Sequence, residues 1–306
     1  VPGLTLDPHI DPTKPPTISS VNTVANVQSL SFINTGTNNE NNPQTDKAHR
    51  LRINTAPSGV VAASSDIGSV LFATPYRYRR TDGTIETHVE ISVSPEDDVE
   101  LRRITITSRT RVARVVELTT YAEVVLAPPA ADAAHPAFSN LFVQTEFAPK
   151  QSAILCTRRA RSQGEKQPWL LHLLVGQGGE QGSISCETDR SRFVGRGRTL
   201  AHPAAMQGMA PLSNTVGSVL DPIISLRRTV SLPPHETAIV DLVVGVTESR
   251  EAALALVEKY QSSRMADRAF DLAWTHSQVT LRHLNATEAE AQLYGRLAGA
   301  LIYADP

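Results

Sequence analysis

The sequence has little of what defines several large classes of protein. Only Cys156 and Cys186 are cysteines among its 306 residues, which excludes a multi-disulfide scaffold and leaves open whether these two pair. No run approaches the roughly 18 consecutive apolar residues of a membrane-spanning helix. The segment VPGLTLDPHIDPTKPP lacks the basic and apolar regions of a signal peptide. We therefore expect a soluble domain in a reducing, cytoplasmic compartment.

The chain also lacks an excess of one charge and the spacing of a metal site. It has 29 Lys and Arg against 31 Asp and Glu, a formal net charge of -2, which gives no long-range attraction to a polyanion. Nucleic acid is therefore not an expected partner. The nine histidines show no H-x-x-x-H or H-E-x-x-H spacing. We predict no metal and no cofactor.

Short runs of alternating polarity dominate residues 71–247. In THVEISVS (87–94) the apolar side chains fall on one face of a strand, and nine or ten such runs predict two stacked antiparallel sheets. In VELRRITITS the alternation changes phase between Leu101 and Ile104, which predicts a bulge or twist at Arg102 and Arg103.

Residues 248–306 change to helical periodicity. Thr247 is a predicted N-cap of the first helix. A second helix carries one predicted apolar stripe, formed by Phe270, Ala273, Trp274, Leu281 and Leu284. The Thr287–Glu290 spacing predicts a capping box that opens a third helix, with Leu293, Leu297 and Leu301 on its apolar side.

Residues 1–70 show the least regular pattern. They are rich in Pro, Asn and Thr, and the Asn-rich segment 34–46 is typical of an exposed loop, because such side chains compete for backbone hydrogen bonds. Only VQSLSFI (27–33) has the pattern of a strand.

The glycines of VGQGGEQGS (175–183) superficially suggest a phosphate-binding loop. The fingerprint G-x-G-x-x-G fails because position 181 is Gln, and a strand-like run follows instead of a helix. We predict a hairpin turn here.

No catalytic group is identifiable from the residues alone. Glu96, Asp97 and Asp98 are adjacent acids in a predicted turn, which usually point into water. The chain has no G-x-S-x-G motif, and neither cysteine lies in a reactive context. Trp169, an aromatic that could stack on a sugar ring, opens the apolar run WLLHLLV and is better explained by core packing.

Six blocks of the chain resemble the cyclic β-1,2-glucan synthases, in a region related to glycoside hydrolase family 94, the cellobiose and chitobiose phosphorylase family formerly classed as glycosyltransferases. They are ETHVEISVSPEDDVELRRITITS, YAEVVLAPPAADAAHPAFSNLFVQTEF, RFVGRGRT, VGSVLDPIISLRR, ESREAALALVEKY and AFDLAWTHSQVTLRHLNATEAEAQLYGRLAGALIY. The resemblance covers residues 84–303. Residues 1–70 depart from it, because they lack the expected Gly-Tyr-rich opening strands.

The resemblance implies a large, mainly β super-sandwich, galactose-mutarotase-like, followed by linker helices toward an (α/α)6 barrel. In the family the phosphorylase general acid and phosphate site belong to that barrel, and sugar transfer from UDP-glucose belongs to a membrane-embedded part of the synthases. We therefore carry over no catalytic residue and do not interpret Arg196 as a phosphate ligand. The parent protein is expected to be anchored in the inner membrane.

The insert LAPPAADAAHPAFS (126–139) is predicted to be a stiff loop, since its prolines fix φ and remove donors. Around it and the glycine- and arginine-rich segment RFVGRGRT (192–199) we select six carbohydrate-contact candidates: Tyr121, Glu123, His135, Asn140, Arg196 and Arg198. The expected function is a non-catalytic carbohydrate-binding module whose partners are a β-1,2-glucan or other glucoside and the downstream barrel. A purely structural docking or homodimerisation module is the alternative, and an independent glycosidase or epimerase is the least favoured hypothesis.

Overall fold

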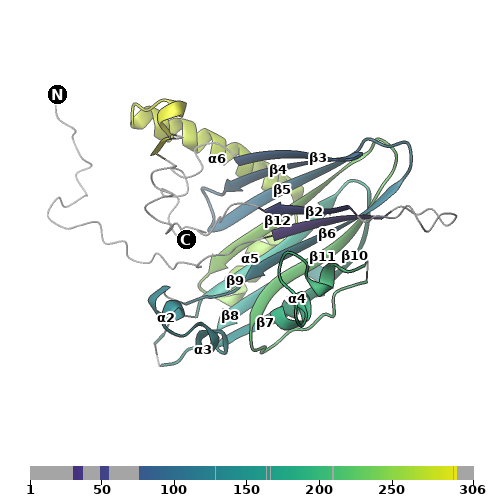
Figure 1. Ribbon diagram of the computed structural model, residues 1–306. Helices are drawn as coiled ribbons and strands as arrows, with labels where there is room; N and C mark the ends of the chain where they lie inside the picture. The colour runs from purple at the N-terminus through teal and green to yellow at the C-terminus, as the bar shows by residue number, and fades with distance from the viewer. Residues whose placement is uncertain are drawn as a thin grey trace.

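Two antiparallel sheets stacked face to face form the body of the protein in the computed structural model (Figure 1). The structure describes residues 30–36, 49–54, 76–127, 129–162, 164–165, 167–208, 210–291 and 293–294. Every ladder between the strands of this described part is antiparallel. The predicted sandwich is confirmed.

The two sheets differ in size. The five-stranded sheet has the order β10-β11-β6-β1-β2, with bounds Glu180–Asp189, Pro222–Leu232, Arg114–Glu123, Leu30–Gly36 and His49–Asn54. The seven-stranded sheet has the order β3-β4-β5-β12-β9-β8-β7, with bounds Tyr76–Asp82, Ile85–Val93, Val99–Ser108, Thr237–Thr247, Trp169–Gln177, Ala153–Arg158 and Val143–Ala148. β1 confirms the predicted strand near residues 27–33 and extends into the Asn-rich segment, whose residues 37–46 lie outside the described part.

The main core lies between the sheets. Ile104 of β5, Leu118 of β6, Leu226 of β11 and Leu242 of β12 are all fully buried there, together with most inward-facing apolar residues of both sheets. Burial of each such side chain stabilises the fold by about 1.5–3 kcal/mol relative to exposure. The alternation seen in the sequence therefore decides which face of each strand meets the other sheet.

Strand β5 corrects the predicted bulge. Its register with β4 and with β12 is continuous through Arg102 and Arg103, so no extra residue is inserted. The phase change arises because both faces of the strand are buried at this end. Leu101 packs outward under helices, while Arg102 occupies an inward-facing position and forms a buried ion pair with Glu100.

Polar side chains also join the two sheets inside the sandwich. The ring nitrogen Nε2 of His172 on β9 lies 2.8 Å from Thr120 Oγ1 on β6, and both residues are buried. Arg228 of β11 donates to Ser152 Oγ at 3.1 Å. These bonds cross between the sheets, so they favour one relative position of the two layers.

Two helices cover the outer face of the seven-stranded sheet. α5 (Arg250–Tyr260) and α6 (Ser263–His283) bury apolar residues against β5, β8, β9 and β12, with Trp169 partly buried beside them as predicted. Across this face Arg103 donates to Asp241 at 2.8 and 2.9 Å and to Asp267 of α6 at 2.6 Å. The guanidinium of Arg103 also lies 5.1 Å from the ring centre of Phe270.

The β4–β5 turn contributes to the same contact. Asp97 accepts hydrogen bonds from Tyr260 Oη at 2.7 Å and Lys259 Nζ at 2.6 Å, and Glu96 pairs with Arg268 at 2.6 Å. The expectation that the three acids simply point into water is therefore wrong for Glu96 and Asp97, whereas Asp98 is exposed as expected. Glu96 and Asp97 bind the helices to the sheet.

Three details of the predicted helical part need correction or confirmation. The N-cap of α5 is Ser249, which accepts from Ala252 N, and not Thr247. The exposed side chains of Trp274 and Leu284 do not share the buried stripe of α6. The Thr287–Glu290 capping box is confirmed, with Glu290 accepting from Thr287 N at 2.7 Å, whereas positions 297 and 301 lie outside the described residues.

The glycine loop and the insert also differ from prediction. Gly178 and Gly179, with φ of +69° and +61°, form a two-residue turn, but β9 and β10 belong to different sheets and do not pair as a hairpin. The insert contains two short helices, α2 (Pro129–Ala134) and α3 (Pro136–Asn140), because proline is well suited to the first helical position. Among the described residues no helix is long and apolar enough to cross a membrane. Both cysteines are free and buried.

We predict a pH-dependent loss of stability that depends on His172. Burial lowers the pKa of His172 to about 3, from 6.5 in its ordinary state. As pH falls below about 6.5, the unfolded chain binds a proton that the folded chain refuses, so the unfolding free energy should fall by about 1.4 kcal/mol per pH unit. Urea unfolding between about pH 7 and about pH 5 measures this slope. His172→Gln should reduce it, and an unchanged slope in the variant would contradict the assignment.

A second prediction concerns the contact between α6 and the sheet. Arg103→Ala leaves the buried Asp241 carboxylate without its cation and should lower the unfolding free energy by about 3 kcal/mol. The matched control is Arg268→Ala, which removes an exposed ion pair with Glu96 and should cost less than about 1 kcal/mol. Urea titrations compare the two, and equal losses would show that the Arg103 network is not the stronger contact.

Candidate functional site

A short helix places polar groups at one end of the five-stranded sheet. β10 ends at Asp189, whose carboxylate accepts from Ser191 N at 2.8 Å and from Ser191 Oγ at 2.7 Å, so helix α4 (Arg190–Val194) begins at the next residue. Phe193 of α4 is fully buried and its ring centre lies 4.9 Å from that of Tyr121 on β6. Tyr121 and Phe193 belong to a small core that covers the outer face of this sheet. α4 is thereby fixed above the strand ends.

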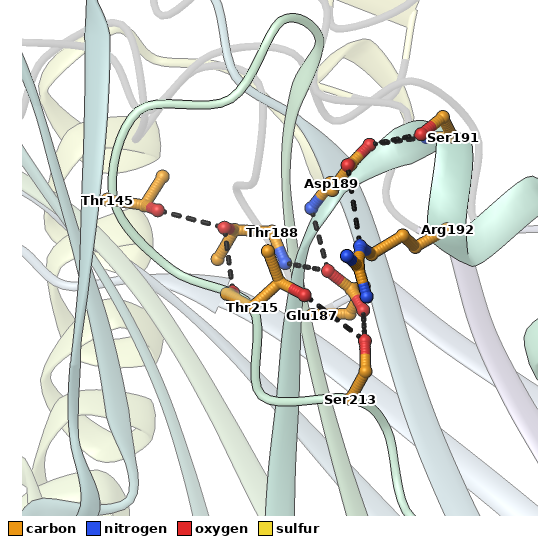
Figure 2. Close-up of polar contacts among 8 residues, drawn as sticks. All are labelled: Thr145, Glu187, Thr188, Asp189, Ser191, Arg192, Ser213 and Thr215. Atoms are coloured by element: carbon orange, nitrogen blue, oxygen red, sulfur yellow. Dashed lines mark hydrogen bonds and ion pairs between the residues drawn. The ribbon is translucent and has the colours of Figure 1, made fainter.

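The buried carboxylate of Glu187 fixes the loop that contains residues 213–215 (Figure 2). Glu187 Oε1 accepts from Thr188 N at 3.0 Å and Asp189 N at 2.9 Å, while Oε2 accepts from Ser213 Oγ. Thr188 Oγ1 donates to Thr215 O at 2.9 Å. Since both oxygens of Glu187 have partners, we assign it a structural role: it holds residues 213–215 against β10, on the path that leads to β11.

Five side chains then meet where β6 and β10 end and β11 begins. Tyr121 Oη donates to Glu123 Oε1 at 3.0 Å, and Arg190 Nε donates to the same oxygen at 3.2 Å. Arg190 Nη1 lies 3.6 Å from Asp221 Oδ2, and Asn140 Nδ2 donates to Asp221 Oδ1 at 3.2 Å. We call these residues, Tyr121, Glu123, Asn140, Arg190 and Asp221, the Glu123 cluster.

The Glu123 cluster is partly open to solvent. The side chains of Arg190, Glu123 and Asp221 are 36%, 46% and 45% exposed. Burial raises the pKa of Tyr121, and the charge of Glu123 adds to the effect. Burial also raises the pKa of Asp221; Arg190 opposes the shift, and the charges of Glu123 and Asp189 reinforce it. The result is an arrangement of donors and acceptors suited to a hydroxyl-rich ligand.

The structure brings together three of the six predicted contact residues. Tyr121, Glu123 and Asn140 lie in the Glu123 cluster, although they come from a strand and from an insert helix. Sequence reasoning missed Arg190 and Asp221. A signal existed for each, since Arg190 follows the capping residue Asp189 and Asp221 directly precedes a strand, but their meeting depends on the fold.

The other three predicted residues lie elsewhere on the surface. His135 is the exposed N-cap residue of α3 and makes no side-chain capping bond. Arg196 and Arg198 are exposed in the turn after α4, where Gly195 has a φ of +83°. A Cβ at Gly195 would lie 2.6 Å from Ala204 Cβ, so glycine allows the turn to approach its neighbour closely. Within the described part, no hydrogen bond or ion pair connects these three to the Glu123 cluster.

No group of three or more His, Cys, Asp or Glu side chains in the described part could hold a metal ion. The Glu123 cluster has two carboxylates, and Arg190 contacts both. Its side chains offer hydrogen-bond donors and acceptors.

Comparison with known proteins gives the family. The profile of the glycosyl hydrolase 94 supersandwich domain matches residues 56–263. The chain is 37% identical over 226 residues to the cyclic beta-(1,2)-glucan synthase NdvB of Rhizobium meliloti (strain 1021). That match covers 74% of this chain and 8% of the relative.

Solved structures resemble the chain only distantly. A polysaccharide lyase aligns with a TM-score of 0.41 and 12% identity, covering 75% of this chain and 27% of its own. A putative kojibiose phosphorylase from the human microbiome aligns with a TM-score of 0.35 and 9% identity, covering 70% and 24%. The family profile, in contrast, matches more than half of the sequence. The chain belongs to the glycosyl hydrolase 94 supersandwich domain family.

Proposed function

We propose that this chain is a non-catalytic carbohydrate-binding and structural module of a cyclic β-1,2-glucan synthase, and that it supports glucan handling by a phosphorylase-like domain. Family membership and the similarity to the NdvB synthase support a place in cyclic glucan synthesis. The chain spans 8% of that relative's length, so the relative's name describes a much longer protein.

The Glu123 cluster is the observation that carries the proposal. It offers two carboxylates, a guanidinium and an amide at a partly open strand end, within a network of hydrogen bonds that already fixes their positions. Glucose hydroxyls both donate and accept, so alternating acceptors and donors of this kind can bind them. Binding then requires little reordering of the side chains.

The same geometry favours binding over bond cleavage. Glycoside hydrolysis needs two carboxyl groups held about 5–9.5 Å apart on either side of the scissile bond. Here Arg190 lies 3.2 Å from Glu123 and 3.6 Å from Asp221, so its guanidinium occupies the space between the two carboxylates. A charge-paired arrangement suits recognition of a polar ligand.

The domain organisation that we propose has three parts. Residues 1–70 form an irregular segment with the first strands, residues 71–247 the super-sandwich, and residues 248–306 a helical linker toward an (α/α)6 barrel. In the whole protein this module would lie in the cytoplasm beside an inner-membrane anchor. The downstream barrel and a homodimer partner are the proposed protein contacts.

A purely structural docking module is the second candidate. It is favoured by exposed apolar side chains on α6 and at its C-cap, namely Trp274 at 54% and Leu284 at 60% exposure. The strong contacts of Arg103 and Asp97 hold the helices on the sheet, so this surface is presented in a fixed orientation. Under this hypothesis the Glu123 cluster would have no glycan ligand.

We expect linear β-1,2-glucans to bind the chain with millimolar or better affinity in calorimetric titrations. Glu123→Gln removes the charge that Arg190 contacts and should weaken binding about fivefold, as should Asn140→Ala. Glu146→Gln is the matched control, because Glu146 forms a similarly exposed ion pair with Arg250. Absence of binding by the parent chain, or an equal loss in the control, would contradict the glycan site. Consumption of the glucan would contradict the non-catalytic assignment.

The docking alternative makes a separate prediction. Trp274→Ala should weaken association with the downstream barrel domain by more than about tenfold, because exposed tryptophans at interfaces commonly contribute much of the binding energy. Light scattering of mixtures measures this. Leu220→Ala, which changes another exposed apolar residue, is the control and should leave association unchanged. If the parent chain does not associate with the barrel, the docking role is wrong.

A further inference from the structure

The second insert helix presents apolar side chains to solvent. Phe138 and Leu141, three residues apart and so on the same side of the α3 turn, are 52% and 40% exposed. The ring of Phe138 packs edge-on against Phe142, with centroids 5.2 Å apart. α2 and α3 form an outer corner of the sandwich, away from α6 (Figure 1). Phe138 and Leu141 therefore form an exposed apolar surface at this corner.

Three arginines surround the same aromatic pair. The guanidinium carbons of Arg158, Arg159 and Arg161 lie 5.2, 5.7 and 5.3 Å from the centre of the Phe142 ring. Arg161 also lies 5.7 Å from the Phe138 ring. Cation–π attraction of this kind holds guanidinium groups close to rings and limits their motion. We call Phe138, Leu141, Phe142 and these three arginines the α3 corner.

Two of the three arginines of the α3 corner are held by carbonyl groups. Arg158 Nη1 donates to Ser139 O at 2.8 Å, and Arg159 Nη2 donates to Leu141 O at 3.0 Å. No ion pair joins the three arginines to a carboxylate within the described residues. Burial lowers the pKa of Arg158, and the positive charge of Arg161 lowers it further. The negative charges of Glu165 and Asp132 oppose this shift. Arg158 is buried, whereas Arg159 and Arg161 are exposed, so these two guanidinium groups can meet an anionic ligand.

The exposed apolar residues restrict the kind of anion. A small free anion would contact the guanidinium groups and leave Phe138 and Leu141 in water. An acidic peptide held by an arginine cluster would likewise use the guanidinium groups and leave the apolar side chains of Phe138 and Leu141 without a partner. At a bilayer surface the lipid phosphates meet the exposed Arg159 and Arg161, while phenyl and leucine side chains enter the boundary between headgroups and acyl chains. An anionic membrane surface therefore contacts both the exposed arginines and the apolar side chains of the α3 corner.

We propose that the α3 corner docks peripherally on a membrane surface that carries anionic phospholipids. This proposal does not rest on glucan binding at the Glu123 cluster. Each arginine near such a surface changes the partition coefficient by about fivefold. One small patch therefore gives weak and reversible binding, which strengthens at low ionic strength.

Vesicle co-sedimentation of the full 306-residue chain tests the proposal. The vesicles contain equimolar phosphatidylglycerol and phosphatidylcholine, with pure phosphatidylcholine as the neutral arm and inorganic phosphate as a soluble competitor. We expect binding to the anionic vesicles only. The double variant Phe138→Ala/Arg161→Ala should lower the partition coefficient by about tenfold, through loss of one charge and one inserted ring.

The matched control is Arg111→Ala/Val112→Ala. These two residues are also an exposed arginine beside an exposed apolar side chain, but they precede β6 and so lie at the end of that strand opposite the insert. The control should bind vesicles like the parent chain. No binding to anionic vesicles at low salt, equal binding to neutral vesicles, or equal loss in the control would each overturn the proposal. Full competition by millimolar inorganic phosphate would reassign the α3 corner as a site for the free ion.

Discussion

Both sheets carry apolar side chains on their two faces, so each face must be packed against another part of the chain. This constraint determines the architecture of the protein. The two sheets cover each other through one shared core. The seven-stranded sheet obtains its second cover from α5 and α6, and the five-stranded sheet from α4 and the loops around it. The Glu123 cluster lies at the end of that second cover, where the strands stop and polar groups become accessible. The candidate site is thus a result of how the outer face is covered.

Much of the fold could be predicted from alternation and spacing. Local sequence determines several of these features, because each depends on residues close together in the chain. They are strands such as THVEISVS, the change to helices after residue 247 and the Thr287–Glu290 capping box. The error at Arg102 has a different cause. A strand buried on both faces shows the same phase change as a bulge, and only the register with its neighbours distinguishes the two.

The candidate site was less predictable for a related reason. The unusual insert points to Tyr121, Glu123 and Asn140, but Arg190 and Asp221 join them through contacts across 67 and 81 residues of sequence. Local pattern contains no information about such pairs. The turn at Gly178 shows the same limit, since its residues indicate a tight turn without indicating that it leads to the other sheet.

The placement of the connections between sheets has a mechanical consequence. The passages from β5 to β6, from β9 to β10 and from β11 to β12 all cross from one sheet to the other at the end of the sandwich farthest from the Glu123 cluster. The crossings at the near end are longer: residues 124–142 join β6 to β7, and residues 55–75 join β2 to β3. The far end therefore acts as the stiff edge of the molecule, and any widening between the layers that accompanies ligand entry should begin beside Glu123.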